Sequence, residues 1–411
     1  MRKIVFIVIF ILISVNSFAD SIFSPNGFVE ENYGLDNFST GMGQTGISSI
    51  FRRNFSVCNP ALNTTVKKTN FFTKMDFGYN YFKDSNDKFE DKIASFPYVS
   101  IIIPVGSSIF LGAKFFEKYH LGLETSNEDS LENIGKYFAD IIYDGSINQI
   151  GLSIAKKIKN ISIGINYNYN FGNKIKELSI DFDDNELEKH FEKLERFYDC
   201  TNFSIGINFP ISKFSFGGFY ESKLKLNSNE KYTIEFASNP DFDLIEESNR
   251  NIVLPSQIGL GIGVKPAEFL FIETDYRQAF WKDATNEKMN KRDSKFYSFG
   301  ISYLPHRKIF WKIATRLGGY YKQLPCKINE NFIDEKGLTF GFDIPLQVKN
   351  KGGLSLAFVW GVRGEVSKNL YSDEFFKVSI GFSSIDWWKN PKKYKKDRKI
   401  PELGSEFRLE Y

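Results

Sequence analysis

The stretch ISIGINYNYNF, residues 161–171, carries the pattern that decides the fold. Large apolar side chains occupy every odd position of this stretch, and serine, glycine or asparagine occupies every even one. Successive side chains of a β-strand point to opposite faces, so the alternation predicts a strand with one apolar face and one small, polar face. The same pattern recurs in residues 354–363 and 376–383.

About fourteen segments of this kind follow one another, each of roughly the ten residues that a tilted strand needs to cross a membrane. They start near residues 69, 92, 108, 147, 160, 201, 213, 256, 268, 295, 309, 337, 352 and 374. A soluble β-sandwich would show the same alternation, with its apolar face turned inward. The pattern of the strands alone therefore leaves both folds open.

The connections between the segments favour the membrane barrel. Short turns near residues 104, 157, 210, 265 and 304 alternate with long polar loops, and the connection at 345–353 is the least tight of the short set. The long loops span roughly residues 83–91, 119–146, 172–199, 226–253, 281–294, 322–336 and 365–373. Tight turns at one end and long loops at the other are typical of outer-membrane barrels, whereas a sandwich has no reason to separate them. We therefore predict an all-β fold, a transmembrane antiparallel barrel of about fourteen strands.

The amino terminus predicts export. Met1-Arg2-Lys3 precedes the apolar run IVFIVIFILI, and small residues around Ala19 suit a cleavage site, so residues 1–19 have the form of a signal peptide. The alternative, a helical membrane anchor, needs about 20 apolar residues, and the run is shorter. We expect the mature protein in the cell outer membrane, in contact with its lipid and with the barrel-assembly machinery during insertion.

Two regions lie outside the predicted barrel at 69–388. Residues 20–68 are rich in glycine, too irregular for a strand and too apolar for free solvent, and we expect them to fold inside the barrel as a plug. The tail at 389–411 is rich in lysine and is expected in the periplasm. A solvated, disordered segment is favoured there over a docking role.

Composition excludes several functional classes. The chain holds 43 Phe and 20 Tyr at a mean hydropathy of −0.29, more aromatic residues than an ordinary soluble core would bury. A net charge of +3 gives no sign of nucleic-acid binding. Three cysteines allow at most one disulfide pair, and three histidines without an adjacent serine motif suggest neither an enzyme nor a metal or cofactor site.

The chain resembles the FadL-type family of outer-membrane transporters for long-chain fatty acids and hydrocarbons. The resemblance is carried by GMGQTGISSIF at 41–51, the triplet Asn59, Pro60 and Ala61, and the stretches at 96–115 and 254–281. It implies a fourteen-stranded barrel whose amino-terminal hatch contains the triplet. Two departures are Ser56-Val57-Cys58, where the family usually has an aromatic residue, and the basic tail.

Two of the long loops carry apolar residues at helical spacing, which predicts a short amphipathic helix in each. The first stripe consists of Ile134, Tyr137, Phe138, Ile141 and Ile142. The second consists of Leu187, Phe191, Leu194 and Tyr198. Such stripes must bury themselves against one another or against a hydrophobic ligand. The resemblance implies that a ligand is captured between these loops.

Charged residues on polar strand faces are expected in the lumen. They are Glu273, Asp275, Arg277, Lys312, Arg316 and Arg363. Enclosed opposite charges normally pair, so mutual pairing and hydrogen bonding to the plug are favoured. The alternative is that Arg316 or Arg363 binds the carboxylate of a ligand.

The sequence thus predicts passive uptake of a hydrophobic small molecule, such as a fatty acid or hydrocarbon, without a cofactor. The competing hypothesis is a barrel similar to the PorV type, which serves as a docking or shuttle component with a partner in protein secretion.

Overall fold

The computed structural model describes residues 21–23, 31–33, 36–48, 58–131, 135–183, 189–236, 244–284, 292–304, 313–346 and 352–385. The predicted signal peptide and the basic tail lie outside these residues.

The described residues form a single antiparallel sheet that closes on itself, because β1 pairs with β16 and β5 pairs with β6. Its strands are β1 (Asn70–Lys83), β2 (Lys88–Val105), β3 (Ile109–Leu131), β4 (Gly135–Ile158), β5 (Ile161–Phe182), β6 (His190–Ile211), β7 (Phe214–Glu221), β8 (Leu224–Phe236), β9 (Leu244–Leu254), β10 (Gln257–Ala267), β11 (Leu270–Ala279), β12 (Ser294–Tyr303), β13 (Ala314–Ile328), β14 (Asn331–Leu346), β15 (Gly352–Arg363) and β16 (Ser372–Ile385).

The wall contains fourteen strands, because two of them are interrupted. β7 and β8 both pair with β6, one after the other, and β9 and β10 pair in turn with β8 and β7. The predicted fourteen-stranded antiparallel barrel is confirmed. Most predicted strand starts lie within about six residues of the observed ones. The exceptions are β4, β6 and the interrupted strand of β9 and β10, which begin at Gly135, His190 and Leu244 instead of near 147, 201 and 256.

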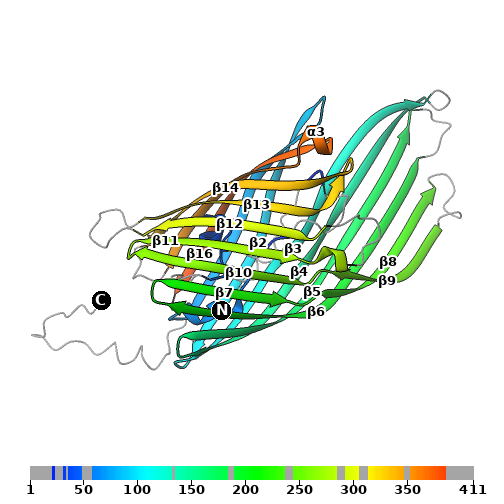
Figure 1. The fold of residues 1–411 in the computed structure, drawn as a ribbon. Coiled ribbons are helices and arrows are strands. Elements are labelled where there is room, and N and C mark those ends of the chain that lie inside the picture. Colours follow the sequence, from blue (N-terminus) through cyan, green and yellow to red (C-terminus); the bar gives the residue numbers. More distant parts are fainter. Residues whose placement is uncertain are drawn as a thin grey trace, which may run out of the picture.

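Three of the predicted long loops are extensions of the wall instead. Residues 121–131 of β3, 135–145 of β4, 172–182 of β5 and 190–199 of β6 form one sheet with β8 and β9, which we call the blade. Figure 1 shows these strands continuing beyond the ends of β10–β14. Adjacent hairpins stabilise one another by pairing, which a single hairpin in water could not achieve.

The two predicted loop helices are therefore wrong. Tyr137, Phe138, Ile141 and Ile142 lie in β4, and Phe191, Leu194 and Tyr198 lie in β6, while Ile134 and Leu187 are outside the described residues. β-branched and aromatic residues favour strands, and Ile141 pairs across the ladder with both Thr125 and Leu178. Strand geometry also divides each predicted stripe between two faces, so that Phe138 and Ile141 point in opposite directions.

The barrel wall is apolar outside and polar inside. Leu152, Leu260, Leu317 and Leu338 have about 60% of their side-chain surface exposed, between 59% and 61%. The alternate, inward positions carry small or polar residues, and Asn166 and Asn170 are almost completely buried. This distribution is the reverse of that in a water-soluble protein. Among the residues described, no helix is long and apolar enough to cross a bilayer.

The amino-terminal segment lies along the inner wall. Residues 36–48 and 58–65, which we call the belt, contain helix α2 (Asn37–Thr40) and the 3-10 helix η2 (Pro60–Thr65). Asn37 donates hydrogen bonds from Nδ2 to the carbonyls of Ser355 and Ser379, 2.8 and 3.0 Å away. Two further short helices, η4 (Trp281–Asp283) and α3 (Val366–Asn369), follow β11 and β15.

Inward-facing glycines make room for the belt, strand by strand. A Cβ at Gly318 of β13 would lie 2.2 Å from the backbone nitrogen of Gly43, and one at Gly300 of β12 would lie 2.3 Å from the carbonyl oxygen of Met42. Similar contacts occur, in order around the wall, for Asn37 at Gly381, Gly41 at Gly341, Ile47 at Gly217, Asn59 at Gly206 and Pro60 at Gly164. These glycines lie toward the end of the barrel with short turns, where Asn70 and Ile385 pair. The belt therefore follows the wall around much of its circumference at that end.

Gly318→Ala tests this packing. The added methyl would overlap the backbone of Gly43, so we expect a loss of about 1–3 kcal/mol in the stability of the barrel. Gly319→Ala is the matched control, since a Cβ there would meet nothing closer than 3.4 Å. Thermal unfolding of the purified variants in detergent measures the difference, and equal stability of the two would contradict tight packing of the belt.

Candidate functional site

An apolar cluster lines the inner surface of the barrel where the blade begins. Its side chains come from β3, β4, β6, β8, β9, the end of β11 and η4, and we call it the mouth cluster. Its members are Tyr119, Leu121, Ile147, Tyr198, Cys200, Leu224, Leu226, Leu254, Ala279 and Trp281. Three smaller buried apolar clusters lie elsewhere in the described part of the barrel. The mouth cluster, with ten members, is the one at the start of the blade.

Most of the mouth cluster was not predicted, and Tyr198 was assigned to a loop helix. Leu224, Leu226 and Leu254 fall at the edges of a stretch that reads as a long polar loop. Leu224 and Leu226 alternate with Lys225, which is the pattern of a strand. This pattern is too short to predict a strand from the sequence alone. Trp281 follows β11 directly and is brought inward by η4, where it is 2% exposed.

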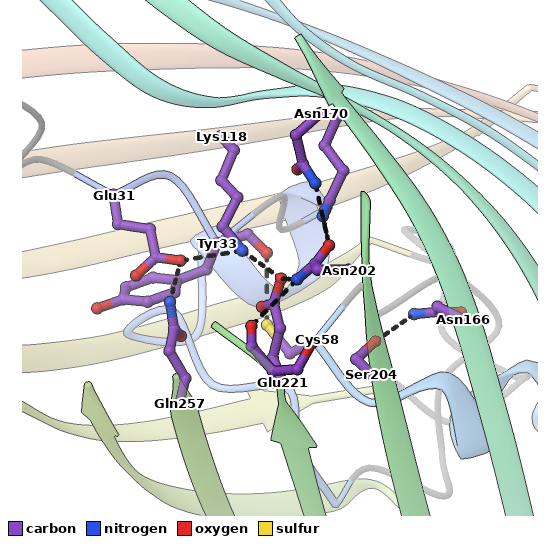
Figure 2. Close-up of polar contacts among 12 residues, drawn as sticks. Glu31, Tyr33, Cys58, Lys118, Asn166, Asn170, Asn202, Ser204, Glu221 and Gln257 are labelled. Carbon is purple, nitrogen blue, oxygen red and sulfur yellow. Dashed lines mark hydrogen bonds and ion pairs between the residues drawn. The ribbon is translucent and has the colours of Figure 1, made fainter. Parts of the chain in front are cut away.

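A buried group of charges lies beside the mouth cluster, and Figure 2 shows its polar contacts. The Nζ of Lys118 on β3 contacts Oε1 of Glu221 on β7 and lies 3.5 Å from Oε1 of Glu31 in the amino-terminal segment. Gln257 of β10 donates a hydrogen bond to Glu31, and Asn202 of β6 donates one of 2.9 Å to Glu221. We call these five residues the ion cluster; it joins the amino-terminal segment to residues of four wall strands, β3, β6, β7 and β10.

The amino-terminal segment also pairs with the backbone of β3. Asn32 donates from its backbone nitrogen to the carbonyl of Lys118 at 2.8 Å, and Ser21 donates to that of Gly122 at 3.3 Å. Glu31 and Tyr119 form an antiparallel bridge. β2 pairs with β3 only from Tyr98 to Val105, so the segment takes up part of the edge that β2 leaves unpaired.

The structure places Glu273, Asp275 and Arg277 on β11 with their side chains buried against the belt. Thr45 donates a hydrogen bond of 3.1 Å to Glu273, and the backbone nitrogen of Ile47 donates one of 3.0 Å to Asp275. Arg277 donates from Nη2 to the carbonyl of Gln44 at 2.6 Å, and its guanidinium lies 4.4 Å from the ring centre of Tyr33.

The other two predicted arginines contact carboxylates of the wall. Arg316 binds both oxygens of Asp343, with Nη1 2.9 Å from Oδ2. Arg363 donates to Glu335 at 2.9 Å and to Asp373 at 3.0 Å. It also donates to the hydroxyl of Ser21 at 2.7 Å. Arg316 and Arg363 therefore both bind carboxylates of the protein itself. A ligand carboxylate would have to displace these partners. Lys312 lies outside the described residues.

A cavity of about 990 Å³, its open side included, separates the amino-terminal segment from β1–β3 and β13–β16. Both signs of charge line it. The charged lining includes Lys74, Asp76, Glu117, Lys322, Glu335 and Lys377. Tyr33, Tyr320 and Phe375 add aromatic surface. The cavity lining therefore combines charged side chains with aromatic ones.

The triplet Asn59, Pro60 and Ala61 starts η2 against the wall. The side chain of Asn59 accepts a hydrogen bond from the backbone nitrogen of Ala61 at 3.0 Å and donates to the carbonyls of Ile47 and Ile207, at 2.7 and 3.0 Å. Asn59 therefore caps the helix and holds two parts of the belt to β6. Pro60 suits the first helical position, which needs no N–H donor.

Within the described ranges, no group of three or more His, Cys, Asp or Glu side chains could hold a metal ion. His120 lies 2.8 Å from Glu117, and His190 lies 2.9 Å from Glu192. His306 is outside the described residues.

The closed barrel with an amino-terminal segment along its inner wall defines a fold shared with known channels. Similar solved structures are the CymD monoaromatic hydrocarbon channel, a FadL homologue of Pseudomonas aeruginosa and the Pseudomonas putida toluene transporter TodX. Their sequence identities are 17%, 12% and 14%, and their TM-scores are 0.60, 0.62 and 0.60. Each match covers 87% of this chain and 98%, 99% or 100% of the other. The FadL-type fold is confirmed.

A family model described as BamG matches residues 1–395, so the chain belongs to the BamG family. The BamG family is a different family by name from the FadL-type family that the sequence resembles. No curated protein matches the chain.

Lys118→Met tests the ion cluster. The substitution leaves two buried carboxylates without their lysine, so we expect a loss of about 3–5 kcal/mol in barrel stability. Lys136→Met is the control, because its ion pair with Glu128 is exposed to solvent and contributes little to stability. Unfolding in urea, followed by tryptophan fluorescence, compares them; a Lys118→Met variant as stable as the control would contradict the structural role of the ion cluster.

Proposed function

We propose that this protein is an outer-membrane channel for the passive uptake of hydrophobic small molecules, such as fatty acids or hydrocarbons. The mouth cluster is the observation that carries the proposal. The members of the mouth cluster are buried, so a hydrophobic molecule would have to displace part of their packing. It would then gain about 25 cal/mol for each Å² of apolar surface that it buries there.

The apolar exterior of the wall supports a membrane location. Leucine, isoleucine and aromatic side chains exposed on every side would destabilise a protein in water, and hydrocarbon lipid would cover them. With the strands placed across the outer membrane, the blade extends outward and the belt lies toward the periplasm. An amino-terminal signal peptide is consistent with this route.

The inner face of the blade combines apolar side chains with the ion pair of Arg196 and Glu230. Ile141 of β4 and Leu194 of β6 share the face that carries the mouth cluster, because their positions differ by an even number from Ile147 and Tyr198. A hydrophobic molecule captured on this face would pass the mouth cluster and reach the cavity. The belt would then act as a plug, and its shift away from the glycines would open the way to the periplasm.

Leu226→Asp tests capture at the mouth cluster. A carboxylate at this position, where Leu226 is completely buried, should reduce uptake of a fluorescent long-chain fatty acid into proteoliposomes at least fivefold. Lys225→Asp is the matched control, because its side chain is exposed on the other face. Ile141→Asp and Phe138→Asp form a second such pair on the blade, of which only the first should reduce uptake.

The folded state of each variant is checked by its change in gel mobility on heating. Equal uptake by the inner-face and outer-face variants would contradict the proposed path. Absence of uptake above empty liposomes, for a folded wild-type barrel, would contradict the channel function itself.

The BamG family match favours a second candidate, a docking role in barrel assembly or protein secretion. The blade offers a sheet surface well beyond the barrel rim for such a role. Deletion of the gene should then slow the folding of other outer-membrane barrels, measured by pulse labelling, even when hydrophobic substrates are absent. Normal barrel assembly in the deletion strain would contradict this candidate.

A further inference from the structure

One edge of the blade has no partner strand among the described residues. β3 pairs with β2 only between Ile109 and Phe116, and a bulge between Glu117 and Tyr119 marks the point where the two strands separate. Beyond the contacts of Tyr119 and Gly122 with the amino-terminal segment, residues 124–131 pair with β4 alone within the described part of the chain. On the side of β3 that faces away from β4, the backbone N–H and C=O groups of residues 124–131 are available to another strand.

The chain itself shows that this edge accepts an added strand. The carbonyls of Lys118 and Gly122 both point to the free side, where they accept hydrogen bonds from Asn32 and Ser21. Backbone groups of a strand alternate sides with a period of two residues, and the register from Tyr119 to Leu131 is unbroken. Glu124, Ser126 and Glu128 therefore turn their N–H and C=O groups to the free side as well.

Beyond Gly122 in the chain, the edge of β3 is exposed to solvent. Residues 124–130 are all exposed, whereas Leu121 and Leu123 below them are buried. Protein sheets usually protect such edges with lysine, proline, bulges or very short strands. Residues 124–131 contain neither lysine nor proline, and in the described structure they pair only with β4.

The charge of this edge selects a kind of partner. Glu124, Glu128 and Asp129 lie on it, and Asp140 and Asp144 lie on the adjacent part of β4. Lys136 is the lysine of this hairpin, and it pairs with Glu128 at 2.7 Å. A second copy of the same edge would bring like charges together, which disfavours self-association.

We propose that residues 124–131 of β3 bind an extended, basic segment of a partner protein as an additional strand. Backbone hydrogen bonds would supply affinity, and lysine or arginine side chains beside Glu124 and Glu128, which share one face of β3, would supply selectivity. This docking surface is independent of the proposed uptake path, because it uses the edge of β3 instead of the inner face of the blade.

The test measures binding of two fluorescent ten-residue peptides, one alternating lysine with valine and one alternating glutamate with valine, to the full-length barrel in detergent. Fluorescence anisotropy should show at least tenfold tighter binding of the basic peptide. Ser126→Pro removes an N–H on the free edge but leaves the pairing with β4, so it should weaken that binding at least tenfold. Ser126→Ala is the control, because both variants lose the contact of the Ser126 hydroxyl with Asp140.

A charge variant separates strand addition from simple electrostatic attraction. The double variant Glu124→Lys with Glu128→Lys should prefer the acidic peptide, and Ser126→Pro added to it should abolish that preference. Binding that is unchanged by Ser126→Pro would overturn the proposal, as would no binding of the basic peptide. Dimerisation lost in Ser126→Pro, detected by light scattering, would also overturn it, since the occupant would then be a second copy. Fatty acid uptake should remain normal in all edge variants.

Discussion

Close packing of the amino-terminal belt against inward-facing glycines is the constraint on which the interior of this barrel depends. A wall of fourteen strands encloses more space than its own side chains fill, so a separate segment must occupy the lumen. The belt can approach the wall only where a side chain is missing, and Gly318 and Gly206 show how little room there is. Its backbone donors then meet Asp275, and its carbonyl at Gln44 meets Arg277.

This arrangement explains why the lumen carries so many charges without exposing them. Arg316 and Arg363 are held by carboxylates of neighbouring strands, and Lys118 is held by Glu31 and Glu221. Buried ions need partners at close range, because the low dielectric of the interior makes an isolated charge very costly. The contact of Lys118 with Glu31 fixes the segment around Glu31, and apolar clusters fill other parts of the inner wall.

The blade gives the molecule two surfaces with separate uses. Its inner face joins the mouth cluster and serves the proposed uptake of hydrophobic molecules, whereas its edge at β3 serves the proposed binding of a partner strand. Both depend on the separation of β2 and β3 beyond Phe116. The fold of hydrocarbon channels and membership of the BamG family are compatible with one barrel having both roles.

The alternation of apolar and small residues, as in 161–171, combined with the alternation of short turns and long loops, was enough to predict the closed barrel, its strand number and most strand starts. It was enough because a strand in such a wall has two different environments, and each residue reports which one it faces. The residues named for the lumen, from Glu273 to Arg363, could be placed inside for the same reason. The blade and the mouth cluster were decided only by tertiary structure: Ile141 and Leu194 fit a helical stripe locally, and hydrogen bonds to neighbouring strands far away in the sequence make them part of a sheet. Which charges pair with which, and which edge of β3 stays unpaired, likewise depends on contacts between distant residues that no local pattern records.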